Sequence, residues 1–257
     1  MGLRRSDPFL AKAVSHLQVL QRFDSSGCKI LPPVWGITVN YLRERCGLRF
    51  AIDVRSVFGR SKILIGSVAL VFFCVTFLST VVSYVLLTTS PTLVGYLQNL
   101  LSSEQSFIAI PPPATSNLYW FILLNNIGHF WNPTRVWVWV PFVGAFSLGY
   151  ELLLNAVIIG GVISFATLTR GAAFTIAGLT PHGVFEIPAF ILEFAALTRW
   201  HITASRAIYG KMSGRQVDRP LFREGMKDTL VLSLFSVVLF AFAAYVEAFI
   251  TPHLIGR

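Results

Sequence analysis

The stretch that decides the fold is ILIGSVALVFFCVTFLSTVVSYVLLTT, residues 63–89. It belongs to a charge-free run that extends from Lys62 to Glu104. About 20 apolar residues in a helix cross the hydrocarbon core of a bilayer, so this stretch predicts a transmembrane helix. Four further apolar runs follow it, and the sequence therefore predicts an all-α, polytopic transmembrane helical bundle of about five spans. Their expected bounds are 63–89, 115–131, 136–167, 171–198 and 229–250.

The composition supports this fold class and excludes several functions. Hydrophobic residues make up 54% of the 257 residues and charged residues only 13%, against about 25% in an average soluble domain. The net charge is +9, and 18 of the 21 Lys and Arg residues lie in two blocks of the sequence, a pattern that indicates membrane topology and no nucleic-acid partner. Walker A, GxSxG and GxGxxG motifs are absent, so we expect no catalytic residue and no cofactor, and the sequence favours a protein that is not an enzyme.

The two basic blocks predict the orientation. Residues 1–62 carry eleven of the 21 Lys and Arg residues, and residues 199–227 carry seven more. Loops rich in Lys and Arg stay in the cytoplasm, so we expect a multi-pass plasma-membrane protein with its N-terminus inside and its C-terminus outside. Residues 1–62 form a cytoplasmic segment with an amphipathic helix at 9–23, and residues 63–257 form the transmembrane domain. The 199–227 loop is suited to docking on anionic lipid head groups.

Proline residues predict where the helices end. Pro91 ends the first span, and residues 91–101 read as an amphipathic helix at the membrane interface. Thr180-Pro181-His182-Gly183 interrupts the fourth span. We expect a broken or re-entrant helix near Pro181–Gly183, because proline removes a helical hydrogen bond.

Polar side chains inside the apolar runs are the candidate functional residues, since burying them in a bilayer is costly. They are Asn125, Asn126, His129, Glu151, Asn155, His182, Glu186 and Glu193. Several are spaced four or seven residues apart, which places them on one face of each helix. We expect these faces to meet inside the bundle. Four glycines are expected at close-packing positions: Gly144, Gly149, Gly160 and Gly183.

Four interpretations of this polar centre remain open. The groups can be hydrogen-bonded links between helices. His129, His182 and Glu186 are weak metal-ligand candidates, with Glu151 as a base, as an intramembrane metallohydrolase would need, although HEXXH is absent. The carboxylates Glu151, Glu186 and Glu193 can relay protons or line a solute path. A binding pocket for a lipid or a peptide is the fourth interpretation.

An ordered set of these residues resembles the stage II sporulation protein M family over about residues 117–250. The set comprises Asn125-Asn126, Gly144, Gly149, Asn155-Ala156, Gly160 and the block Pro181-His182-Gly183-Val184-Phe185-Glu186-Ile187-Pro188-Ala189. The last block is the most specific, since it is similar to the family's Pro-His-Gly-x-x-Glu-x-Pro-Ala signature. Ala156 stands where the pattern has glycine, and His129 and Glu151 are not carried over from it.

The resemblance implies a polytopic membrane protein of about five spans. In spore-forming bacteria such a protein helps to anchor a complex that remodels the cell wall during engulfment. It thus implies a non-enzymatic scaffold or anchor, with membrane or cell-envelope proteins as partners besides the lipid bilayer. The alternative function is a transporter or channel whose cavity is lined by the His, Glu and Asn side chains.

Overall fold

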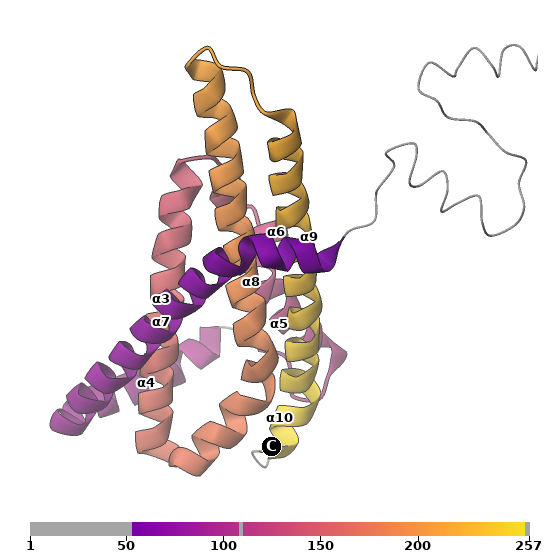
Figure 1. Ribbon diagram of the computed structural model, residues 1–257. Helices are drawn as coiled ribbons and strands as arrows, with labels where there is room; N and C mark the ends of the chain where they lie inside the picture. Colours follow the sequence, from indigo (N-terminus) through magenta and orange to yellow (C-terminus); the bar gives the residue numbers. More distant parts are fainter. Residues whose placement is uncertain (1–52, 108–109, 255–257) are drawn as a thin grey trace, which may run out of the picture. The chain divides into compact units, whose positions relative to one another are not determined.

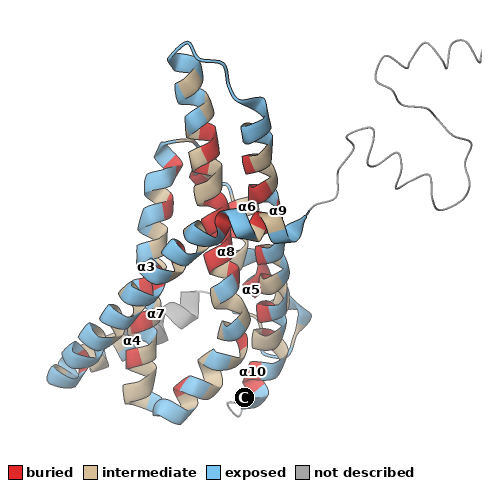
Figure 2. Ribbon diagram, viewed as in Figure 1, coloured by how far each residue is buried: buried red, intermediate tan, exposed pale blue. Residues whose placement is uncertain are grey.

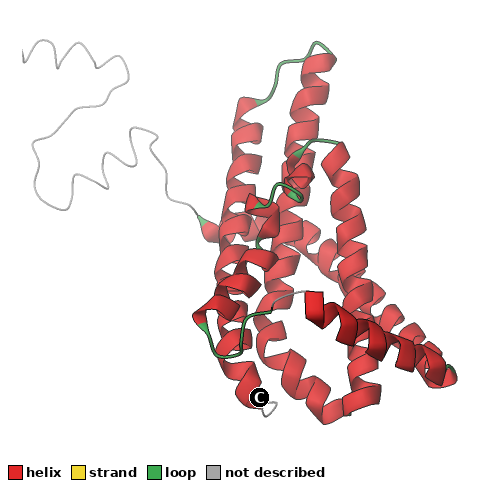
Figure 3. Cartoon of the chain, turned by 180° about the vertical axis from the view of Figure 1, so that it is seen from behind, coloured by secondary structure: helices red, strands yellow, loops and turns green. Residues whose placement is uncertain are grey.

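The computed structural model describes residues 53–107 and 110–254, and the amphipathic helix expected at 9–23 lies outside them. Within the described ranges all regular structure is helical, as predicted (Figures 1 and 3). The elements in chain order are α3 (Val54–Thr89), α4 (Pro91–Phe107), α5 (Ser116–Asn126), α6 (Gly128–Trp131), the 3-10 helix η1 (Val136–Trp139), α7 (Val143–Arg170), α8 (Ala172–Met212), α9 (Arg219–Tyr245), the π-helix η2 (Val246–Ile250) and α10 (Thr251–Leu254).

Four helices in the described part of the chain are long and apolar enough to cross a membrane. They are α3, α7, α8 and the continuous run of α9, η2 and α10 over Arg219–Leu254. This confirms the predicted all-α transmembrane fold. The expected second span at 115–131 consists of α5 and α6, which have 11 and 4 residues. A helix needs about 20 residues to cross the hydrocarbon core, so neither crosses it alone.

The expected break near Pro181–Gly183 is wrong, because α8 continues through it for 41 residues. Pro181 and Pro188 both lie inside the helix. Proline is tolerated in membrane helices because local adjustments and neighbouring elements compensate the lost hydrogen bond, and α8 as a whole packs along both α9 and α7. The lower part of α8 bends in both views, as expected for a helix that contains proline (Figures 1 and 3).

The stretch expected to be a basic loop at 199–227 is also mostly helical. It comprises the end of α8 and the beginning of α9, joined by a short turn at 213–218. Asp218 caps α9, since its side chain accepts a hydrogen bond from the Leu221 backbone nitrogen at 3.1 Å. At 1.5 Å per residue, α8 is about 60 Å long, roughly twice the thickness of a bilayer's hydrocarbon core. The basic residues therefore lie on a helical hairpin, and the part of α8 that precedes this hairpin is still long enough to cross the hydrocarbon core.

Helices α3 and α7 cross at a close contact that depends on Gly160. A Cβ atom at Gly160 would lie 2.7 Å from the Thr76 carbonyl oxygen and from the Ser79 Cβ. The contact is reinforced by the Ser164 hydroxyl, which donates to the Thr80 carbonyl at 2.7 Å. Small residues permit such an approach of two backbones.

The other glycines expected at close-packing positions behave differently from one another. A Cβ at Gly144 would lie 2.5 Å from the Val138 carbonyl oxygen, so α7 begins tightly against η1. Among the described residues, a Cβ at Gly149 would meet nothing within 4 Å, and one at Gly183 would meet only Ile187 of its own helix, at 4.0 Å. The expectation of close packing is corrected at these two positions, because neither glycine faces a neighbouring helix.

Buried residues gather along α8 and α9, whereas α3 is largely exposed (Figure 2). A buried carboxylate near the basic hairpin joins three helices. Asp228 on α9 is 0% exposed and accepts hydrogen bonds from Arg60 Nε on α3 at 3.2 Å and from Arg199 Nη2 on α8 at 2.8 Å. Two cations thus balance a charge that would be costly to bury alone.

Candidate intramembrane polar cavity

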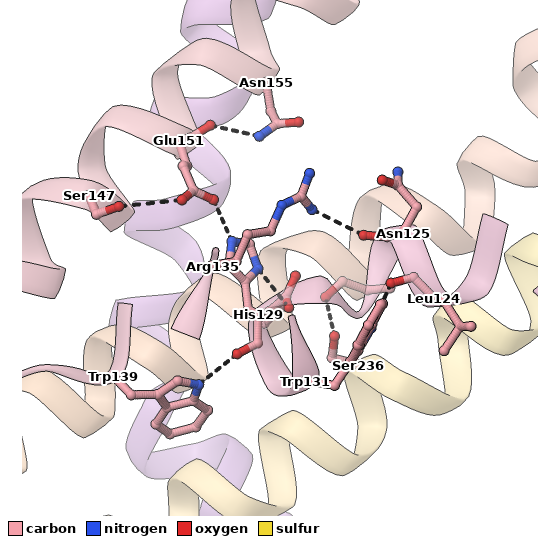
Figure 4. Close-up of polar contacts among 12 residues, drawn as sticks. Leu124, Asn125, His129, Trp131, Arg135, Trp139, Ser147, Glu151, Asn155 and Ser236 are labelled. Atoms are coloured by element: carbon pink, nitrogen blue, oxygen red, sulfur yellow. Dashed lines mark hydrogen bonds and ion pairs between the residues drawn. The ribbon is translucent and has the colours of Figure 1, made fainter. Parts of the chain in front are cut away.

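The interrupted segment between α5 and α7 places several polar groups beside α7 and α8. Helix α5 ends at Asn126, and Asn132-Pro133 separates α6 from η1. Arg135 Nη1 donates to the Asn125 carbonyl at 3.0 Å, and Trp139 Nε1 donates to the His129 carbonyl at 2.8 Å (Figure 4). These bonds satisfy carbonyls at helix ends, which have no partner within their own helices.

His129 lies between two carboxylates from different helices. Its Nδ1 is 3.0 Å from Glu193 Oε1 on α8, and its Nε2 contacts Glu151 Oε2 on α7 (Figure 4). His129 and Glu193 are 3% and 1% exposed. A neutral imidazole has only one N–H donor, so the two contacts require either an imidazolium or a protonated carboxyl group. The three side chains therefore share at least one proton that can occupy more than one site.

A cavity of about 370 Å³ lies next to this triad. Its polar lining consists of Asn125, Asn126, Arg135, Glu151, Asn155, Glu186 and Glu193. Leu154 and Ile158 also line it and are 40% and 52% exposed, so the cavity is not sealed on the α7 side. Its volume and polar lining suit water molecules or a small polar ligand. Three carboxyl groups outnumber the guanidinium and the shared proton of the triad, and this balance favours a ligand with positive charge.

A second polar group adjoins the cavity through Glu186. The Asn126 amide donates to Glu186 Oε1 at 3.2 Å, and His182 Nε2 lies 3.8 Å from Glu186 Oε2. Glu247 of η2 completes the group, since one ligand atom each from His182, Glu186 and Glu247 lie within 4.8 Å of one another. This second group therefore extends the polar region from the cavity to the C-terminal end of the long α9–α10 run.

The structure distributes the predicted site residues over these two adjoining groups. Six of them line the cavity: Asn125, Asn126, Glu151, Asn155, Glu186 and Glu193. The expected combination of His129 with His182 and Glu186 is not formed, because Glu151 and Glu193 hold His129. Asn155 donates to the Glu151 carbonyl of its own helix at 2.8 Å.

Two residues of the site were not among those predicted. Arg135 follows Asn132-Pro133, a pair that ends helices, so the sequence predicts that Arg135 lies in a loop between two spans. Glu247 is an isolated carboxylate in the last apolar run. The rule that an ionisable residue inside a span marks a site, which identified Glu151, would also have identified Glu247.

The fold and this polar centre define a helical membrane protein with ionisable side chains inside its transmembrane region. The chain belongs to the stage II sporulation protein M family, whose match covers residues 68–252. It is also 29% identical over 122 residues to an uncharacterized protein of Methanocaldococcus jannaschii. That match covers 46% of this chain and 66% of the archaeal one, just under two thirds of its length. No solved structure gives a significant match.

Proposed function

We propose that this protein is a transporter or channel for small cations, protons included, and that the polar cavity is its binding site. The observation that carries the proposal is the cavity of about 370 Å³ next to the His129–Glu151–Glu193 triad. Side chains that served only as links between helices would fill the space between them. Here carboxylate, amide and guanidinium groups surround open volume instead.

The chemistry of the triad supports movement of protons through the same site. His129 exchanges hydrogen bonds with carboxylates on two helices, and Glu151 and Glu193 also line the cavity. A proton held by the triad can therefore pass to a water molecule in the cavity with little rearrangement. Chains of Glu and His inside a membrane are the usual components of such relays.

The interrupted second segment supports the same function. Discontinuous helices form ion sites in transporters, because their ends present unpaired backbone groups near the middle of the membrane. In this chain α5, α6 and η1 replace a continuous helix, and Asn125, Asn126 and Arg135 of this region line the cavity. With this segment counted as one crossing, the chain is a five-span plasma-membrane protein with its N-terminus inside and its C-terminus outside.

A proton-flux assay tests the proposal. Full-length protein in liposomes, with a pH-sensitive dye inside and an imposed potassium diffusion potential, should acidify the lumen faster than empty liposomes do. Glu151→Gln removes a relay carboxylate but preserves its shape, so we expect the rate to fall by about 10²-fold or more. Glu224→Gln is the matched control, because Glu224 is 42% exposed and pairs with Arg60 away from the cavity. Equal rates for empty and protein-containing liposomes, or for Glu151→Gln and the unchanged protein, would contradict the proposal.

A scaffold or anchor is the second candidate function, and one observation favours it. The helical hairpin at 199–227 carries seven Lys and Arg residues and extends beyond the length of α8 needed to cross the core. Such a surface suits the cytoplasmic face of an anionic membrane or an acidic partner protein. The flux assay separates the candidates, since a scaffold that carries nothing gives no flux in any variant.

A further inference from the structure

The three side chains of the second polar group come from two helical runs. His182 and Glu186 lie one turn apart on α8, and Glu247 lies in η2, the π-helix that follows α9. One ligand atom from each residue lies within 4.8 Å of the other two. His182 is 9% exposed, and Glu186 and Glu247 are partly buried.

Hydrogen bonding within the protein satisfies this group only in part, through the Asn126 amide that donates to Glu186 Oε1. His182 Nε2 and Glu186 Oε2 are 3.8 Å apart, which is too far for a hydrogen bond. His182 Nδ1 is buried without a hydrogen-bond partner among the residues that the structure describes. Two carboxylates at this separation also repel each other unless a cation or a proton lies with them. An ordered water is a common partner for a buried nitrogen such as Nδ1, and Nε2, which faces Glu186, is the nitrogen available to an ion.

The same separations fit a bound metal ion. Two ligands at about 2.1 Å from a tetrahedral ion are about 3.4 Å apart, so the 3.8 Å between His182 and Glu186 needs only a small adjustment. His182 and Glu186 are held at this spacing by one turn of α8. Only Glu247 has to approach from the neighbouring run.

The π-helix gives a second and independent indication of a site. A π-turn widens the helix by one residue and changes the direction of its side chains, and such turns occur frequently at functional sites. Here η2 spans Val246–Ile250 and contains Glu247. Its Ala248 carbonyl accepts a hydrogen bond from the Ala114 backbone nitrogen at 3.0 Å, so the segment before α5 fixes the turn that carries Glu247.

We propose that His182, Glu186 and Glu247 bind a divalent transition-metal ion of the zinc type. One imidazole and two carboxylates are ligands that Zn²⁺ accepts, and the imidazole argues against Mg²⁺ and Ca²⁺, which prefer oxygen ligands. Three protein ligands leave a fourth position open. The inference rests on the proposed function in one respect. Glu186 also lines the cavity, so the bound ion would be one of the cations that the cavity accepts.

Metal titration of the purified full-length protein tests the site. After treatment with a chelator, Zn²⁺ binding is followed by calorimetry, and Co²⁺ is added separately because its absorption bands report a tetrahedral site. We expect one site that Glu247→Gln weakens by at least about tenfold, with His182→Gln acting in the same direction. Glu224→Gln should bind as the unchanged protein does. Zn²⁺ affinity that is the same in Glu247→Gln and in the unchanged protein would overturn the proposal, and would point to ligands elsewhere, such as Cys28 and Cys46.

Thermal unfolding guards against variants that simply fail to fold. Without metal, Glu247→Gln should unfold at the same temperature as the unchanged protein or higher, because one of two neighbouring carboxylates is neutralised. With Zn²⁺, the midpoint should rise for the unchanged protein and rise clearly less for Glu247→Gln. A rise of equal size in both would contradict the site.

Zn²⁺ binding without proton flux would refute the proposed function alone, and flux without Zn²⁺ binding would refute the metal site alone.

Discussion

At the scale of single residues, six carboxyl and imidazole side chains of the described part of the chain lie in two groups of three. His129 contacts Glu151 on α7 and Glu193 on α8, whereas His182 lies near Glu186 of its own helix and Glu247 of η2. The sequence predicts that most of these side chains face one another, since the second, third and fourth predicted spans each carry polar residues at helical spacing. It does not predict how they are paired, because pairing depends on the rotation and height of neighbouring helices.

Gly160 and Gly149 form a matched pair for testing the packing of α7. A methyl group at Gly160 would press on the α3 backbone, whereas at Gly149 it would meet open space. We expect Gly160→Ala to lower the free energy of unfolding by about 1–3 kcal/mol. Gly149→Ala should leave it unchanged or raise it by up to about 1 kcal/mol, because alanine favours a helix over glycine. Unfolding of the solubilised protein, followed by near-ultraviolet circular dichroism, gives both values, and equal changes would show that α3 and α7 do not cross at Gly160.

At the scale of helices, the main surprise is which segment is interrupted. The sequence places a break at Pro181–Gly183, but α8 is continuous there, and the interruption lies between Asn126 and Val143. The presence of proline does not distinguish the two segments, since both the continuous helix and the interrupted segment contain proline. The continuous helix as a whole packs against α7 and α9, whereas the interrupted segment is stopped by Asn132-Pro133 and held by the Arg135 side chain. Such support from tertiary contacts cannot be read from local sequence.

A distance measurement tests the continuity of α8. Spin labels are attached at Ile176→Cys and Tyr209→Cys, both exposed positions, in a background with Cys28, Cys46 and Cys74 replaced by alanine. A continuous helix places these positions about 50 Å apart, less a small shortening from the bend. Double electron–electron resonance should therefore give one long distance. A main distribution below about 40 Å would mean that the chain turns back near Pro181.

At the scale of the whole molecule, the fold class follows from composition, but its details need the packing. The charge-free run at 63–89 becomes most of α3, and the apolar runs at 136–167, 171–198 and 229–250 lie within or largely within the other long helices. The sequence predicts a loop for the basic block at 199–227, because charged residues usually lie in solvent-exposed segments. It is instead a helical hairpin, since solvent exposure does not prevent two helices from packing together.

The central claim is that the polar residues surround a cavity that water reaches, in place of a dry contact between helices. Reaction of introduced cysteines with a membrane-impermeant thiol reagent tests this most directly, because a thiol reacts only where water reaches it. Asn155→Cys lies in the cavity lining, and Val157→Cys, 47% exposed on the same helix, is the matched control because it lies outside that lining and is expected to face lipid. In the cysteine-free background we predict that Asn155→Cys is labelled in intact membranes and that Val157→Cys is not. Asn155→Cys that stays as unreactive as Val157→Cys would contradict the account.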